Sequence, residues 1–127
     1  MPHFIIDCSD NLQTKKTPDQ IMKVVYVAAE STGLFAQNDI KVRLSFYKHF
    51  MLGQGKQHFL HVSSYIIEGR SKEQIAQLSR LIIESLNQLL PDVDFLSVNV
   101  YEFDLTTYCN KSLIDPLNFE KDRHFLL

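Results

Sequence analysis

Residues 71–91 read SKEQIAQLSRLIIESLNQLLP and carry every signal of a helix. Ser71 and Gln74 have the spacing of a capping box, in which each side chain bonds the backbone of the other residue. Apolar residues then return at every third or fourth position, namely Ile75, Leu78, Ile82, Leu86 and Leu89. Pro91 ends the run, because proline cannot continue a helix. The stretch therefore predicts a long helix with one buried face.

The stretch TPDQ at 17–20 predicts a second helix that starts in the same way. Thr17 is the expected N-cap, Pro18 suits the first helical position, and Gln20 completes the capping box. Apolar residues follow at helical spacing, namely Ile21, Val24, Val25, Ala28 and Ala29. Gly33 is a natural stop, since glycine readily takes the left-handed conformation that ends helices.

Segments rich in β-branched and aromatic residues predict four strands, at 3–8, 41–47, 58–67 and 95–103. The order along the chain is strand, helix, strand, and this order occurs twice. We therefore expect a single domain over 1–127, built from one βαβ unit at about 2–50 and a second at about 57–104. The remaining 105–127 have no clear periodicity, and we expect an extended C-terminal tail packed on a neighbouring subunit.

The expected fold class is α+β. A right-handed crossover places each helix over its own parallel strand pair, so two units build a four-stranded mixed sheet with both helices on one face. No helix remains to cover the other face. Yet the strand at 95–103 carries Leu96, Val98 and Val100 on one side and Phe95, Tyr101 and Phe103 on the other, so it has apolar residues on both sides. We expect the bare face to be covered by self-association.

Composition narrows the functional classes. The 127 residues are 45% hydrophobic and 22% charged, with a formal net charge of −2, which argues against a nucleic-acid surface. No apolar run approaches the length of a membrane span, and the first residues carry no basic leader, so a soluble, cytoplasmic protein is expected. Cys8 and Cys109 are too few for a disulfide framework and too distant for a CxxC motif, so both are expected to be free thiols.

The usual catalytic motifs are missing, including nucleophile elbows, phosphate-binding loops and HExxH zinc motifs. His58 and His61 have the spacing of a weak metal pair, but residues three apart on a strand point to opposite faces. They are better interpreted as a surface and a core histidine. His3, His49 and His124 have no evident partners in the sequence, so no metal site is expected.

Pro2 has two interpretations. In one, it simply begins an edge strand, where its missing N–H is harmless. In the other, removal of Met1 exposes a secondary amine at the start of the first strand. Such an amine is mostly protonated at neutral pH unless burial and nearby cations lower its pKa. With that pKa lowered toward 7, it becomes a general base that can move a proton along a substrate.

Three cations are candidates for such a site. Lys41 and Arg43 lie two apart in a predicted strand and share a face, although a solvated strand edge explains them nearly as well. Arg70 directly precedes the helix start at Ser71. A basic residue there opposes the helix dipole, which points to a separate purpose such as binding an anion.

Several stretches together are similar to one known family. They are MPHFIIDCSDN at 1–11, TGLF at 32–35, IKVR at 40–43, GRS at 69–71 and LNF at 117–119. With them the chain resembles the 5-carboxymethyl-2-hydroxymuconate Δ-isomerases of the tautomerase superfamily. The similarity extends over nearly the whole chain.

The resemblance implies a homotrimer of double βαβ subunits that uses no metal or cofactor, with Pro2 as the base after Met1 is removed. It implies a di- or tricarboxylate substrate, with 5-carboxymethyl-2-hydroxymuconate converted to 5-oxopent-3-ene-1,2,5-tricarboxylate in homoprotocatechuate breakdown. Arg70 then matches an arginine that holds a substrate carboxylate, and Arg43 matches a second basic position. Lys41 stands where the family carries arginine, which keeps the charge but loses bidentate geometry.

Two alternatives remain open. The same base can act on another enol acid, such as a phenylpyruvate-like enol. Alternatively, the chain is a non-catalytic trimeric binding module with the same fold. The second alternative applies if Met1 stays attached, because the Pro2 nitrogen is then a non-basic amide.

Overall fold

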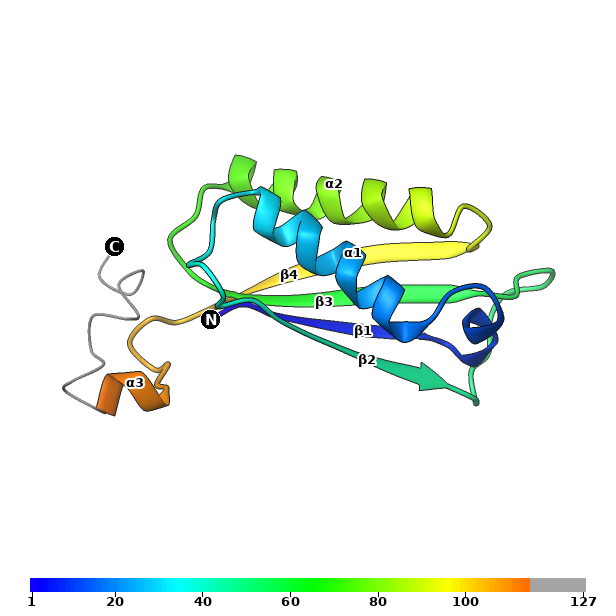
Figure 1. Ribbon diagram of the computed structural model, residues 1–127, viewed down its shortest axis with the longest axis horizontal. Helices are drawn as coiled ribbons and strands as arrows, with labels where there is room; N and C mark the ends of the chain where they lie inside the picture. Colours follow the sequence, from blue (N-terminus) through cyan, green and yellow to red (C-terminus); the bar gives the residue numbers. More distant parts are fainter. Residues whose placement is uncertain (115–127) are drawn as a thin grey trace.

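The computed structural model describes residues 1–114. Its elements are β1 (His3–Ser9), the 3-10 helix η1 (Asp10–Thr14), α1 (Pro18–Ser31), β2 (Lys41–Tyr47), β3 (Phe59–Ile67), α2 (Lys72–Leu89), β4 (Phe95–Phe103) and α3 (Lys111–Ile114). The strand order in the sheet is β2-β1-β3-β4, with parallel outer pairs and an antiparallel central pair. Both long helices cover one face of this sheet (Figure 1). The predicted α+β fold with a mixed four-stranded sheet is confirmed.

Both long helices begin at the predicted capping boxes. The Thr17 hydroxyl accepts from the Gln20 backbone N–H, and the Gln20 side chain accepts from the Thr17 backbone N–H. Ser71 and Gln74 repeat this exchange at the start of α2. Gly33 follows α1 with a φ of 69°, a left-handed conformation that glycine adopts without strain. Local signals therefore fix where each helix lies in the chain.

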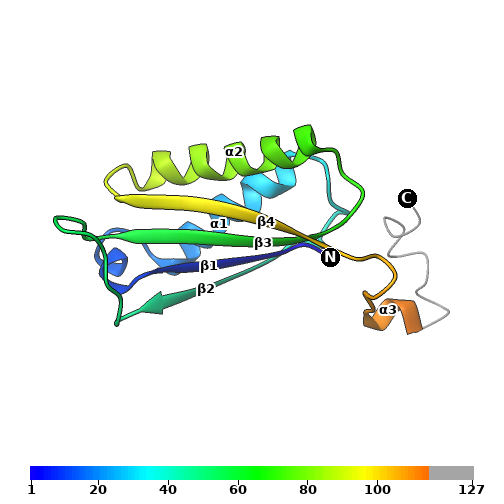
Figure 2. The same ribbon diagram turned by 180° about the vertical axis from the view of Figure 1, so that it is seen from behind.

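The core lies between the two helices and the covered face of the sheet. Fully buried side chains come from both central strands and both helices, including Phe4, Ile6, Leu60, Val62, Ile21, Val25, Leu78, Ile82 and Leu86. Cys8 is a buried free thiol in this core, and Cys109 is an exposed free thiol. Since side chains alternate along a strand, His3, Ile5 and Asp7 point to the opposite, open face. Figure 2 shows the molecule from behind.

The strand register brings four chain segments to one end of the sheet. His3 pairs with Lys41 on β2 and with Tyr65 on β3. The starts of β1 and β2 therefore lie beside the ends of β3 and β4, and the N-terminus lies where the chain leaves β4 toward α3 (Figures 1 and 2). Residues far apart in sequence meet at this end.

The open face carries stacked aromatic side chains. The Tyr65 ring stacks on Tyr101 with centroids 5.1 Å apart and on Phe103 at 5.9 Å. Tyr101 and Phe95 are each 45% exposed. The predicted alternation of β4 is thus present, with Leu96, Val98 and Val100 packed on the core. Aromatic surface therefore remains open to solvent near both ends of β4 on the single chain.

The expectation for the C-terminal tail is wrong in its first part. Residues 111–114 form α3, which begins where Asn110 Oδ1 accepts from the Leu113 N–H at 3.2 Å and from the Ser112 hydroxyl at 2.9 Å. Leu105, Tyr108 and Leu113 pack on Met1 and Ile67 of the same chain, because these apolar side chains lie within reach at the sheet end. The rest of the predicted tail, 115–127, lies outside the described residues.

Helix η1 was also not predicted, since its stretch holds one buried apolar residue, Leu12, and no periodic pattern. The strands agree with prediction at β2 and β4, while β1 ends and β3 begins one residue later than expected. Within residues 1–114, no helix is both long enough and apolar enough to pass through a bilayer.

Candidate active site

Pro2 lies buried at the start of β1, directly beside the start of β2. Its carbonyl oxygen accepts from the Lys41 backbone N–H at 3.1 Å, which continues the parallel ladder by one residue. The chain terminus is therefore held in a fixed place on the sheet. With Met1 attached, the Pro2 nitrogen is an amide and carries no proton to exchange.

Met1 is held at both its ends. Its ammonium donates to the Asp39 carbonyl oxygen at 3.1 Å and to Asp39 Oδ2. Its side chain is buried and packs on Ile67, with Phe103 and Leu105 around it. Burial is the main cause that lowers the pKa of this ammonium from 8.0 to about 6. An amine in this position is therefore largely uncharged at neutral pH.

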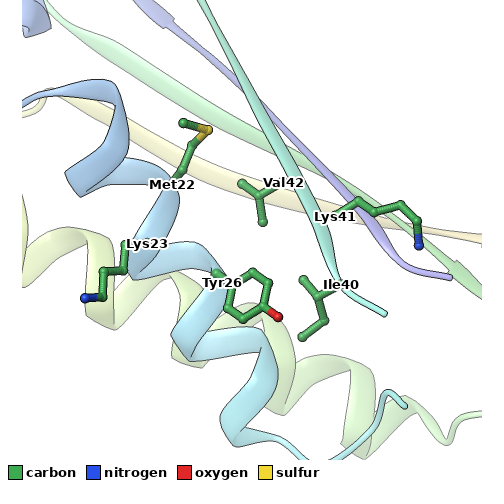
Figure 3. A pocket seen from close by; sticks show the side chains of 6 residues that line it. All are labelled: Met22, Lys23, Tyr26, Ile40, Lys41 and Val42. Atoms are coloured by element: carbon green, nitrogen blue, oxygen red, sulfur yellow. The ribbon is translucent and has the colours of Figure 1, made fainter. Parts of the chain in front are cut away.

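Lys41 and Arg43 share the open face of β2, as their spacing predicts, and Lys41 lies beside the terminus. Figure 3 shows the shallow groove between α1 and β2, where Ile40 and Val42 face Tyr26 of α1 and the Lys41 ammonium points away from the helix. Lys41 Nζ donates to the Asp39 carbonyl oxygen at 2.6 Å and lies 3.5 Å from Asp39 Oδ1. The positive charge of Lys41 thus lies next to the chain terminus.

Arg43 contacts His3, so the expectation that His3 has no partner is wrong. The guanidinium nitrogen of Arg43 lies 3.3 Å from His3 Nδ1, because the register places the two strands side by side here. Burial is the main cause that lowers the pKa of His3, and Lys41 and Arg43 lower it further. His3, Arg43, Ile5, Tyr65 and Phe103 line a small hollow on the open face. In this hollow the Arg43 guanidinium lies near the stacked rings of Tyr65 and Phe103.

Arg70 lies at the same end of the sheet but in a different cleft. Its guanidinium donates to the Leu34 carbonyl oxygen at 2.6 Å and to the Ile67 carbonyl oxygen at 3.0 Å. It also lies over the Phe35 ring, 5.3 Å from the centroid. Burial lowers the pKa of this guanidinium, while the charge of Glu102 raises it. These contacts hold Arg70 beside Ile67, the residue on which Met1 packs.

The structure therefore places Lys41 beside Pro2, Arg43 beside His3, and Arg70 beside Ile67, the residue on which Met1 packs. The other histidines are elsewhere: His61 Nδ1 lies 2.7 Å from the Ser97 hydroxyl, and His58 Nδ1 lies 3.8 Å from Asp94. His124 is outside the described residues. Among residues 1–114, no three or more His, Cys, Asp or Glu side chains are grouped to hold a metal ion.

Residues 2–116 match the family model of 5-carboxymethyl-2-hydroxymuconate isomerase. The chain belongs to this family. It is thus a member of an isomerase and tautomerase family, as the resemblance of its opening residues and its Gly-Arg-Ser motif implies.

Known relatives of this isomerase family agree in sequence and fold. The 5-carboxymethyl-2-hydroxymuconate Delta-isomerase of Escherichia coli is 28% identical over 86 residues, which are 66% of this chain and 68% of that protein. A crystal structure of a 5-carboxymethyl-2-hydroxymuconate isomerase from Deinococcus radiodurans R1 superposes with a TM-score of 0.72 at 21% identity, covering 87% of this chain and 88% of that one.

A second similar structure is a fused 4-OT described as a wild-type symmetric trimer. It has a TM-score of 0.70 at 14% identity and covers 85% of this chain and 90% of that one. At these identities the two superpositions show a shared tautomerase-like fold.

Asp39 is a residue of this site that sequence reasoning missed. It precedes Ile40 and Lys41 and contacts the terminus only because β2 pairs with β1 in this register. The available signal was the position of Asp39. In a parallel ladder in which Lys41 pairs with His3, the residue two positions before Lys41 lies beside Met1.

Proposed function

We propose that the protein is a tautomerase that moves a proton along a conjugated enol carboxylate, with the nitrogen of Pro2 as general base once Met1 has been removed. The observation that carries this proposal is the placement of the terminus. Pro2 is fixed at the sheet end beside Lys41, with Arg43 next to His3, in a chain whose family is that of the 5-carboxymethyl-2-hydroxymuconate isomerases.

The surroundings of the terminus favour a neutral amine. Burial lowers the pKa of the Met1 ammonium to about 6, and Lys41 adds to this effect. After Met1 is removed, the Pro2 nitrogen becomes the terminal amine, one residue further along the chain and next to the same groups. A secondary amine is intrinsically more basic, so the same surroundings bring its pKa toward neutrality, where a general base works best.

The cations favour an anionic substrate. Lys41 lies on the open side beside Pro2, Arg43 lies there beside His3, and Arg70 lies in the cleft next to Ile67. A substrate with two or three carboxylates can contact more than one of them. We therefore propose 5-carboxymethyl-2-hydroxymuconate as substrate and 5-oxopent-3-ene-1,2,5-tricarboxylate as product.

The proposed reaction conserves atoms and electrons. The Pro2 nitrogen accepts the enol proton, so the O–H bond breaks and the carbonyl forms. The electrons of the diene shift toward the far carbon, which takes a proton from the Pro2 ammonium and forms a C–H bond. The nitrogen is neutral again, so the step requires neither a metal nor a cofactor.

The test is a ketonisation assay on protein whose intact mass shows that Met1 is absent. We expect the loss of dienol absorbance to accelerate with 2-hydroxymuconate-type substrates, with kcat/KM rising from mono- to di- to tricarboxylate enols. A preference for a phenylpyruvate-like enol would instead support the alternative substrate. Absence of ketonisation with every enol would refute the proposed activity.

We also propose that the subunits form a homotrimer through the open face of the sheet. The aromatic rings of Tyr65, Tyr101 and Phe103 are stacked there, and an exposed apolar surface of this kind favours association. A structure with the same fold is described as a symmetric trimer.

Replacing Tyr101 by Glu is expected to convert the trimer to monomers, because it places a charge on the apolar face. Light scattering during size-exclusion chromatography measures the mass. Gln88→Glu, on the exposed side of α2, is the matched control and should remain trimeric. A monomeric unaltered protein would contradict the proposed assembly.

One observation favours the non-catalytic alternative. Met1 is buried, and its ammonium is paired with Asp39, so a chain that keeps Met1 has a well-packed terminus without a basic proline. Intact mass of the natively expressed protein decides between the two. Retained Met1 supports the binding module, and its removal supports the enzyme.

A further inference from the structure

Asp39 is the acidic residue at the proposed site. It lies just before β2 and contacts the chain terminus with both its backbone and its side chain: the terminal ammonium donates to its carbonyl oxygen and to Oδ2. The side chain of Asp39 is 22% exposed and that of Met1 is 4% exposed. The contact is thus shielded from water, where charge interactions are stronger than at an open surface.

Lys41 lies on the other side of the same carboxylate. Its Nζ is 3.5 Å from Asp39 Oδ1, while the terminal amine contacts Oδ2. Asp39 therefore lies between two cations, one of which is the chain terminus. The carboxylate favours the charged form of the terminal amine, and Lys41 disfavours it.

Other charged groups near the terminus come from each neighbouring element. His3 of β1 and Arg43 of β2 contact each other on the open face. Arg70, before α2, donates to Leu34 and Ile67, and Glu102 of β4 acts on Arg70.

On the remaining sides, Glu68, after β3, accepts from the Leu105 N–H at 2.6 Å. The segment 105–114 contributes the phenol of Tyr108 to the apolar cluster around Met1. Asp39 and Lys41 are the charged side chains that act directly on the terminal amine.

We propose that Asp39 is the counter-ion of the N-terminal amine, and that Asp39 and Lys41 together set the pH at which this amine becomes a free base. For the trimmed chain this rests on the proposed function, since the amine is then that of Pro2. Asp39 is a positioning residue: it acts on the base and not on the substrate. Because Asp39 stabilises the ammonium, it raises the pKa of the amine. The amine is then a stronger base, but a smaller fraction of it is unprotonated at neutral pH.

Asp39 and Lys41 have opposite effects on the pKa of the terminal amine. Loss of a purely structural contact does not produce shifts of opposite sign. Replacing Asp39 by Asn removes the negative charge, so the terminal ammonium is less stable and its pKa falls by about 1. Replacing Lys41 by Gln removes a positive charge, so the pKa of the amine rises. The free-base fraction at mildly acidic pH therefore increases in the first variant and decreases in the second.

The experiment measures the amine directly, without a substrate. Protein is treated briefly with acetic anhydride at a series of pH values, and acetylation of the N-terminal tryptic peptide, which ends at Lys15, is measured by mass spectrometry. This peptide is identical in all variants, since the substitutions lie outside it. The pH of half-maximal rate gives the pKa of the amine, whether the chain begins at Met1 or at Pro2.

We expect this pH to fall by about 1 in Asp39→Asn, which corresponds to about tenfold faster acetylation below the pKa. It should rise in Lys41→Gln and stay unchanged in Asp92→Asn, which removes a carboxylate at the opposite end of the sheet. Asp39→Glu keeps the charge and should retain the original value. If Asp39→Asn does not fold, the rise expected in Lys41→Gln is the test.

Equal values in all variants, or shifts of the same sign, would overturn the inference. The outcome is separate from that of the proposed activity. If the protein has no tautomerase activity but the pKa of its amine shifts in opposite directions in Asp39→Asn and Lys41→Gln, the counter-ion role of Asp39 stands and the proposed activity is refuted. If the protein is an active tautomerase but these pKa shifts are absent, the proposed activity stands and the counter-ion role of Asp39 is overturned.

Discussion

Removal of Met1 is expected to raise kcat/KM for ketonisation by about 10²–10⁴-fold, the usual contribution of a general base. The reason is chemical: with Met1 attached, the Pro2 nitrogen is an amide that cannot accept a proton. Fractions of one preparation, before and after treatment with a methionine aminopeptidase, provide the two forms. Intact mass gives the trimmed fraction, and activity should be proportional to it.

A Pro2→Ala variant refines this prediction. After Met1 removal it still has a terminal amine, but this amine is primary and lacks the ring that packs at the buried start of β1. We expect activity between those of the trimmed and the untrimmed protein. Activity that does not depend on the trimmed fraction would contradict Pro2 as base, and so would a Pro2→Ala variant as fast as the parent.

The helices and strands were predictable because their signals are local. The capping boxes at Thr17 and Ser71 each involve a residue three positions away, and both are present in the structure. The four strands follow from side-chain type, and β2 and β4 match their predicted bounds. Lys41 and Arg43 share one face of β2, as their spacing predicts, because a strand fixes which residues share a face.

The contacts within the site were not predictable, because they depend on the register between strands. Asp39 contacts a residue 38 positions away, and Arg43 contacts His3 across 40 positions. A shift of one residue in the pairing would separate both pairs. Arg70 illustrates the same limit, since its position before α2 suggested an anion site, whereas in the structure it also holds two backbone carbonyls.

Replacing Arg70 by Ala is expected to lower kcat/KM for a tricarboxylate enol by about 10–10²-fold. Hydrogen bonds to charged groups contribute about 1.5–3 kcal/mol, and about 1.4 kcal/mol corresponds to a factor of ten. Arg70→Lys should lie in between, because an ammonium keeps the charge but contacts a carboxylate at one point. Steady-state kinetics with mono- and tricarboxylate enols measure the effect.

The difficulty is that Arg70 also fixes the loop after α1, through the Leu34 carbonyl oxygen and the Phe35 ring. Loss of this structural role lowers the rate equally for every substrate and reduces the free energy of unfolding. Loss of carboxylate binding lowers the rate mainly for substrates with more carboxylates. Arg80→Ala, an exposed arginine further along α2, should change neither quantity. If Arg70→Ala slows mono- and tricarboxylate enols equally, Arg70 serves to hold the loop, and Lys41 and Arg43 are the cations left to bind the substrate.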